Sequence, residues 1–234
     1  MTVPVTEIDF VQKIDPVYKA IQKVSSDPTL NNKNTIGFVG APWTLMVYMM
    51  NQQSPKKNLK KSFFEDEILI NRILLIIEKF LKVHIKNQVD SGANIIQIFD
   101  SWAGLLEYKY FDKYIYNPTQ ELVNYVKSLN VEVICFPRGI KFYKEYCDIV
   151  KPNVISIDYE VDPTVIAKEI NIPIQGGLDP KFLLLDKKEM LEKAKQYLEI
   201  FKNHQYIFNL GHGVLPETNP ENVKILVEFV KDFK

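Results

Sequence analysis

Residues 95–104, IIQIFDSWAG, combine a nearly continuous apolar run with an abrupt polar end. The apolar part, Ile95 to Phe99, is rich in β-branched side chains, which is typical of a strand covered on both faces in a parallel sheet. Asp100 and Ser101 follow directly, and Gly104 allows a turn. Because parallel β/α folds place their site at the carboxyl ends of the strands, this stretch predicts one wall of a binding site.

The same kind of run recurs along the chain and alternates with helical patterns, which favours a β/α array. The six predicted strands are Thr35–Val39, Ile95–Phe99, Val131–Phe136, Val154–Asp158, Ile172–Gly176 and Tyr206–Leu210. The polar, lysine-rich residues Asn51–Ser62 predict a loop. No linker or repeat separates these elements, so we expect one domain over residues 1–234.

Helix starts are predicted where an Asx residue precedes proline, because Asx suits the N-cap and proline the first helical position. Such pairs are Asp15-Pro16, Asn117-Pro118, Asp162-Pro163, Asp179-Pro180 and Asn219-Pro220. Thr218 with Glu221 would form a capping box before the last helix. Amphipathic patterns predict further helices over Asp9–Val24 and Ile68–Val83.

The strand count bears on the architecture. A closed (β/α)8 barrel has eight strands in about 250 residues, whereas six are predicted in these 234 residues, and the first predicted element is a helix. We interpret the chain as an α/β protein of the (β/α)8 TIM-barrel type, incomplete at its N-terminus. An open doubly wound sheet is the alternative, because it requires no further strands.

Composition excludes several classes of partner. Lys+Arg and Asp+Glu both number 29, so the net charge is zero and neither nucleic acid nor an anionic membrane is an expected partner. Cys135 and Cys147 lack metal-ligand spacing and predict free thiols in a reducing compartment. Residues 1–9 carry two acids and no apolar core, so they do not resemble a secretory signal. We expect a soluble, cytoplasmic enzyme without a metal site.

The segment GFVGAPWTLMVYMM, residues 37–50, begins within the first predicted strand and continues beyond its end. It lacks the patterns of a phosphate loop. It offers an apolar wall and the Tyr48 hydroxyl, which suits a large, flat, partly apolar ligand. The alternative is that Trp43, Tyr48 and the methionines belong to the core.

Ser101 and His212 are the other candidate site residues. No nucleophile-elbow pattern surrounds Ser101, so we interpret it as a hydrogen-bond donor to a ligand carboxylate, with a capping role as the alternative. His212 lies between two glycines at a strand end, where the backbone can approach a ligand and the imidazole can titrate near neutral pH. His84 and His204 are expected at the surface.

Three acids at or after strands, Asp100, Asp158 and Asp179, are candidates for proton transfer. Asp179 is largely explained as a helix cap, whereas Asp158, which ends a strand, is not so easily explained. The pair Gly176-Gly177 predicts a turn first and an anion-binding loop second.

Five motifs resemble uroporphyrinogen decarboxylases in order and spacing. They are Gly37 to Leu45 with Tyr48, Phe99 to Gly104, Cys135 to Gly139, Gly177 to Pro180, and Asn209 to Gly213. The resemblance implies a cofactor-free (β/α)8 barrel, usually a homodimer, that removes the four acetate carboxylates of uroporphyrinogen III to give coproporphyrinogen III in heme biosynthesis.

The resemblance also implies roles for individual residues. Tyr48, Ser101 and His212 would contact the tetrapyrrole and its carboxylates, while Phe38 and Phe99 would line the apolar part of the cleft. The family's catalytic arginines and aspartate belong to an N-terminal stretch that nothing in Met1–Val24 matches. We therefore expect a C-terminal fragment with little decarboxylase activity of its own.

Two alternatives stay open. A related corrinoid or thiol methyltransferase shares the barrel but needs zinc ligands, which Cys135, Cys147 and His212 do not supply as a sequence cluster. A non-catalytic tetrapyrrole-binding remnant would keep the fold without the chemistry. Bound zinc would favour the first alternative, and porphyrin binding without turnover would favour the second.

Overall fold

The computed structural model describes residues 6–51 and 66–233, and it divides into two compact units. The first comprises Met1–Ile140 and Asp148–Pro152, and the second comprises Lys141–Cys147 and Asn153–Lys234. The predicted loop Asn51–Ser62 lies almost wholly outside the described residues, and the single-domain prediction stays a prediction.

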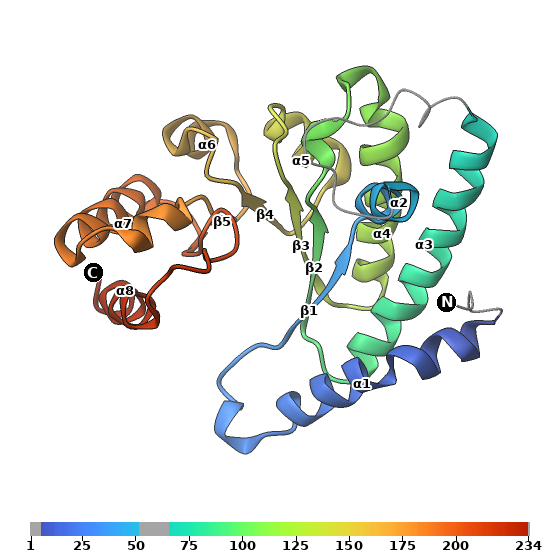
Figure 1. Ribbon diagram of the computed structural model, residues 1–234, viewed down its shortest axis with the longest axis horizontal. Helices are drawn as coiled ribbons and strands as arrows, with labels where there is room; N and C mark the ends of the chain where they lie inside the picture. The colour runs from blue at the N-terminus through green and yellow to red at the C-terminus, as the bar shows by residue number, and fades with distance from the viewer. Residues whose placement is uncertain (1–5, 52–65, 234) are drawn as a thin grey trace. The chain divides into compact units, whose positions relative to one another are not determined.

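The first unit is a parallel sheet with helices on one face (Figure 1). Strands β1, β2 and β3 pair in chain order, and the register aligns Gly40 with Phe99 and Phe99 with Phe136. The elements are α1 (Glu7–Ser25), β1 (Ile36–Gly40), α2 (Pro42–Asn51), α3 (Glu67–Asp90), β2 (Ile95–Asp100), α4 (Asn117–Ser128) and β3 (Glu132–Pro137). Helix α5 (Tyr143–Val150) follows.

Helix α3 packs its apolar stripe on the sheet, because residues at helical spacing, from Ile70 to Ile85, are buried. Its Gln88 amide accepts a hydrogen bond from Phe38 N at 2.9 Å and donates one to Phe38 O at 3.0 Å. Gln88 thus satisfies main-chain groups of β1 that strand β2 does not bond. A Cβ on Gly37 would lie 2.7 Å from Gln88 Oε1, so this approach requires glycine.

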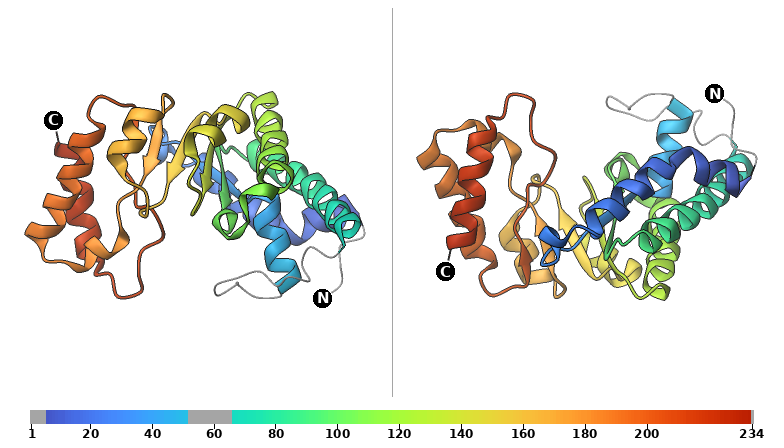
Figure 2. Two further views of the ribbon diagram at one scale, coloured as in Figure 1. Left: turned by 90° about the horizontal axis from the view of Figure 1, so that it is seen from above. Right: turned by 90° about the horizontal axis from the view of Figure 1, so that it is seen from below.

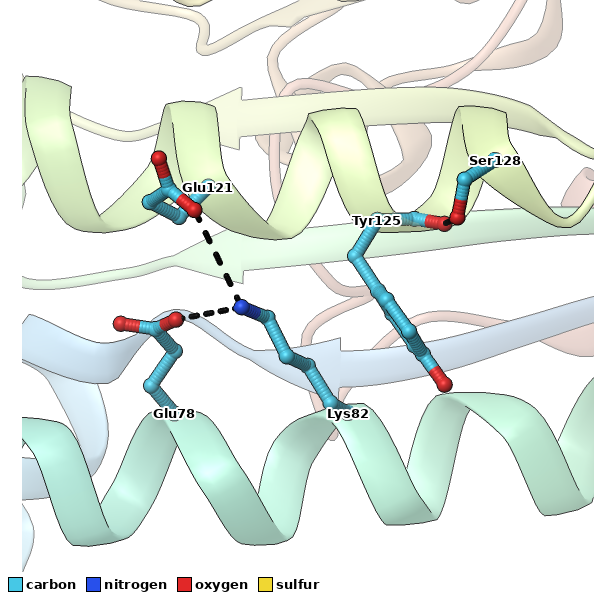
Figure 3. Close-up of polar contacts among 5 residues, drawn as sticks. All are labelled: Glu78, Lys82, Glu121, Tyr125 and Ser128. Carbon is cyan, nitrogen blue, oxygen red and sulfur yellow. Dashed lines mark hydrogen bonds and ion pairs between the residues drawn. The ribbon is translucent and has the colours of Figure 1, made fainter.

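Helices α3 and α4 are joined by the ammonium of Lys82, which lies between two carboxylates (Figure 3). Lys82 Nζ is 2.6 Å from Glu78 and 3.9 Å from Glu121, and it lies 5.8 Å from the centre of the Tyr125 ring. The lysine is partly buried, so this group is screened less than an exposed pair.

Helix α1 lies against α3 (Figure 2), and aromatic side chains of the two helices are in contact. The Phe10 and Phe80 rings are 4.9 Å apart, and the Tyr18 hydroxyl is 3.1 Å from His84 Nδ1. Burial lowers the pKa of His84. The prediction of a surface position for His84 is therefore wrong, because α1 covers that face of α3.

Three of the five helix starts predicted at Asx-Pro pairs are confirmed. Asp162, Asp179 and Asn219 each cap a helix and accept a hydrogen bond from the main-chain N–H two residues later. The predicted capping box at Thr218 is wrong, since Asn219 is the N-cap.

The helix starts predicted at Asp15 and Asn117 are wrong. Helix α1 begins earlier, at a capping box formed by Thr6 and Asp9, and Pro16 lies inside it on the exposed side. Asn117 continues from the π-helix Asp112–Tyr116, so the preceding residues already have helical dihedrals and no N-cap is required.

The second unit repeats the parallel arrangement on a smaller scale. Strands β4, β5 and β6 pair in chain order, and helices α7 and α8 lie side by side over a core that includes Met190 and Leu226 (Figure 2). The elements are β4 (Val154–Ile157), α6 (Pro163–Glu169), β5 (Ile174–Gly176), α7 (Lys187–Phe201), β6 (Tyr206–Ile207) and α8 (Pro220–Asp232).

Within each unit the strand order follows the chain order without the reversal that defines a doubly wound sheet. The prediction of six parallel strands of a (β/α)8 barrel is thus confirmed. Strand β6 is shorter than predicted. The Asn209 side chain accepts a hydrogen bond from Leu210 N at 2.8 Å and competes with the ladder, which resumes only as a bridge between Leu178 and Leu210. No helix within residues 6–51 and 66–233 has the length and apolar character needed to cross a bilayer.

Candidate active site

A row of three phenylalanines crosses the sheet of the first unit near the carboxyl ends of its strands. The Phe38 and Phe99 rings meet edge to face at 5.9 Å, and Phe99 meets Phe136 in the same manner at 5.9 Å. Gly37 faces Gln88 of α3, so alternation places Phe38 on the opposite face of β1. Phe38 is 63% exposed although it belongs to the central part of a strand. This row brings together the two predicted apolar site residues.

Tyr48 and Trp102 form the next part of the site. Their rings meet edge to face at 5.9 Å, and Tyr48 is 38% exposed. Trp43 is fully buried, stacks on Tyr114 at 5.8 Å and donates from Nε1 to Trp102 O at 3.0 Å. The core alternative therefore holds for Trp43, whereas Tyr48 keeps its hydroxyl-bearing ring at the surface.

The turn after β2 carries Ser101 and is fixed to the end of β3. Arg138 N donates to Asp100 O at 3.1 Å, and Gly104 N donates to Arg138 O at 2.9 Å. A Cβ on Gly104 would lie 2.5 Å from Gly139 O, so the two turns touch through their main chains. Ser101 is half-buried in this turn.

Asp100 is directed toward α2. Thr44 Oγ1 donates to Asp100 Oδ1 at 2.6 Å and accepts from Trp102 N at 3.1 Å, while Asp100 Oδ2 is buried with no hydrogen-bond partner among the described residues. Burial raises the pKa of Asp100 to about 7, and the Thr44 bond partly opposes this rise. The carboxyl lies on the helix side of the sheet, whereas the phenylalanine row lies on the other side.

His212 lies in the second unit, at the loop after β6. Gly211 N donates to Leu178 O at 2.8 Å, and a Cβ on Gly211 would lie 2.4 Å from Tyr159 N. The loop is therefore pressed onto the main chain at the end of β4, and only glycine fits there. His212 itself is exposed.

Asp158 and the glycine pair of the second unit have structural explanations. The Tyr143 hydroxyl donates to Asp158 Oδ2 at 3.2 Å, and Glu160 N donates to Oδ1 at 2.8 Å. Burial is the main cause of a raised pKa at Tyr143, so its proton stays on the phenol. Gly176 and Gly177 both have positive φ, as the predicted turn requires.

In the described part of the chain, no group of three or more His, Cys, Asp or Glu side chains lies close enough together to hold a metal ion. Cys135 is buried within β3. Thiolate or imidazole clusters of the kind that bind zinc are therefore not formed by these residues.

The sequence model of uroporphyrinogen decarboxylases matches residues 3–233. The chain belongs to the uroporphyrinogen decarboxylase family. The phenylalanine row, the Ser101 turn and the His212 loop are thus features of a member of this family of carboxy-lyases.

Relatives and solved structures agree with this membership. The uroporphyrinogen decarboxylase of Rickettsia bellii is 37% identical over 228 residues, which are 95% of this chain and 67% of that protein. The one from Wolbachia pipientis is 38% identical over 221 residues, covering 93% of this chain and 65% of that protein. The chain thus spans about two thirds of the length of these relatives.

Two solved structures share the fold. A methyltransferase from Methanosarcina mazei is 20% identical with a TM-score of 0.76, covering 99% of this chain and 68% of that one. A B12-independent methionine synthase from Shewanella is 12% identical with a TM-score of 0.60, covering 92% and 64%. At these identities the likeness concerns the fold alone.

Sequence reasoning missed Phe136 as a member of the row. The signal was available, since the Cys135 to Gly139 motif ends a predicted strand next to Phe99, and in-register parallel neighbours share a face. The five predicted site residues fall into two groups. Phe38, Tyr48, Phe99 and Ser101 lie in the first unit, and His212 lies in the second.

Proposed function

We propose that this chain binds uroporphyrinogen and serves in its conversion to coproporphyrinogen, in which four acetate carboxylates are removed. The observation that carries the proposal is the exposed Phe38 ring against Phe99, with Ser101 in the turn that directly follows the strand of Phe99, in a member of this family. An apolar surface flanked by hydroxyl donors suits a tetrapyrrole, whose rings are apolar and whose rim carries carboxylates.

Each predicted site residue has a proposed contact with the substrate. Phe38 and Phe99 contact the pyrrole rings, the hydroxyls of Tyr48 and Ser101 donate to carboxylates, and His212 contacts the substrate. A pyrrole acetate loses carbon dioxide once its ring is protonated, so the reaction needs a proton donor and an anion near the cationic ring.

Asp100 does not suit that role, because its carboxyl is bonded to Thr44 on the helix side of the sheet. Asp158 is occupied by Tyr143 and the Glu160 amide. We therefore propose that the chain holds the substrate and turns it over slowly by itself. Rapid formation of coproporphyrinogen by the purified chain would contradict this part of the proposal.

Removing the hydroxyls tests the assignment of Tyr48 and Ser101. Tyr48→Phe and Ser101→Ala are each expected to weaken binding of uroporphyrin, the oxidised and fluorescent form of the substrate, by about tenfold, because a hydrogen bond to a charged group contributes about 1.5–3 kcal/mol. Fluorescence titration measures the dissociation constants. Ser128→Ala is the control, since the Ser128 hydroxyl donates to Tyr125 O on α4 (Figure 3). Equal affinity in all four proteins would contradict the assignment.

A further inference from the structure

We infer that Arg138 is a further substrate-binding residue, whose guanidinium holds a carboxylate of the tetrapyrrole beside Ser101. The inference rests on the proposed function and adds a specificity determinant to the same site. Arg138 is one of two arginines in the sequence, the other being Arg72.

Main-chain hydrogen bonds place Arg138 beside the turn that carries Ser101. Strands β2 and β3 pair from Ile95 with Glu132 to Asp100 with Pro137. Arg138 N donates to Asp100 O within this last pair, and Arg138 O accepts from Gly104 N, so the main chain of Arg138 lies against both ends of that turn.

Alternation along the strands assigns a face to both residues. Phe99 and Phe136 share a face, as their ring contact at 5.9 Å confirms. Ser101 and Arg138 each come two residues later, at the first position after their strands, and we infer that they continue the same face at the carboxyl end of the phenylalanine row. The Asp100 carboxyl is on the other face, where it bonds to Thr44 of α2. It therefore does not neutralise the guanidinium.

The charge of Arg138 is available to a ligand. The guanidinium of Arg138 forms no ion pair with any carboxylate of the described residues, and the residue is half-buried, where a charge-assisted contact is stronger than in open solvent. Its planar fork of donors matches a carboxylate in a bidentate manner.

The main chain of Arg138 is held in place by hydrogen bonds that do not involve its side chain. Its hydrogen bonds to Asp100 O and from Gly104 N are made by the main chain. A substitution at this position leaves both bonds in place, so its effect on binding can be separated from an effect on folding.

Titration of the purified chain with uroporphyrin tests the inference. Arg138→Gln is expected to weaken binding by at least about tenfold, with Arg138→Lys in between, because lysine keeps the charge but not the fork. The difference between Arg138→Gln and the unaltered chain is expected to shrink as sodium chloride is raised. Arg72→Gln, an exposed site on α3, is the matched control and is expected to change the affinity by less than about twofold.

Each outcome has a distinct meaning. Equal affinity of Arg138→Gln and the unaltered chain overturns the inference and leaves the proposed function standing. A loss of binding that persists unchanged at high salt also overturns it, because it would indicate a structural role. Failure of the unaltered chain to bind uroporphyrin overturns the proposed function and the inference with it.

Discussion

Replacing Gly211 with alanine is expected to destabilise the second unit by about 3 kcal/mol, the upper part of the range for overpacking, and to displace His212 from the end of β4. The added Cβ would lie 2.4 Å from Tyr159 N and 2.8 Å from the carbonyl carbon of Asp158. Both atoms belong to the main chain at the end of a buried strand and cannot rotate away. The loop must therefore move, and with it the side chain proposed to contact the substrate. Urea denaturation and uroporphyrin titration measure the two effects.

Gly213 provides the control on the other side of His212. A Cβ there would meet nothing within 4 Å, so Gly213→Ala is expected to change neither stability nor binding appreciably. Similar losses in both variants would show that general stiffening of the loop, and not the contact with β4, accounts for the effect.

Asp100→Asn is expected to remove a pH dependence from the stability of the first unit. Burial raises the pKa of Asp100 to about 7, whereas in the unfolded chain the group titrates near its usual value of about 4. Between these pH values the folded protein binds a proton that the unfolded chain has lost, so the free energy of unfolding falls as pH rises. At about 1.4 kcal/mol for each pKa unit, the decline reaches roughly 4 kcal/mol between pH 4 and pH 7.

The neutral asparagine keeps an acceptor for Thr44 and does not ionise, so the variant is expected to lack this decline and to exceed the unaltered chain in stability at pH 8. Urea denaturation from pH 4 to pH 8, followed by tryptophan fluorescence, measures it, since Trp43 and Trp102 both lie in the first unit. Asp112→Asn, at an exposed position, is the control. Parallel pH curves for Asp100→Asn and the unaltered chain would contradict the assignment.

The strands were the part of the fold that the sequence predicted best. Ile95 to Phe99 is apolar nearly throughout, as is typical of a mostly buried strand between two parallel neighbours, and such runs are easily recognised. Strand β6 was overextended, since an apolar run does not reveal that the Asn209 side chain bonds Leu210 N in place of the ladder.

Two predictions failed for different reasons, one because a stronger local signal lies earlier in the chain and one because of a tertiary contact. The pair Asp15-Pro16 is compatible with a helix start, yet the capping box at Thr6 starts α1 earlier and the exposed side of the helix tolerates Pro16. His84 was expected at the surface because nothing local indicates that Phe10 and Tyr18, more than 60 positions away, would cover it.

The sequence predicted individual site residues but not how their side chains are arranged relative to one another. Phe38, Phe99 and Ser101 stood out as residues in or just after predicted strands, where parallel folds bind ligands. The inward direction of Asp100 and the place of Phe136 in the row depend on register and alternation, which required the pairing of β2 with β3. Sequence motifs mark such positions without distinguishing the two faces of a strand.

Tryptophan fluorescence during titration of the unaltered chain with uroporphyrin tests the central claim most directly. Trp102 contacts Tyr48 and adjoins Ser101, so a tetrapyrrole bound on the phenylalanine row lies close enough to quench its emission. We expect saturable quenching at one tetrapyrrole per chain that uroporphyrinogen reverses by competition under anaerobic conditions. Quenching that does not saturate, or that uroporphyrinogen leaves unchanged, would contradict it.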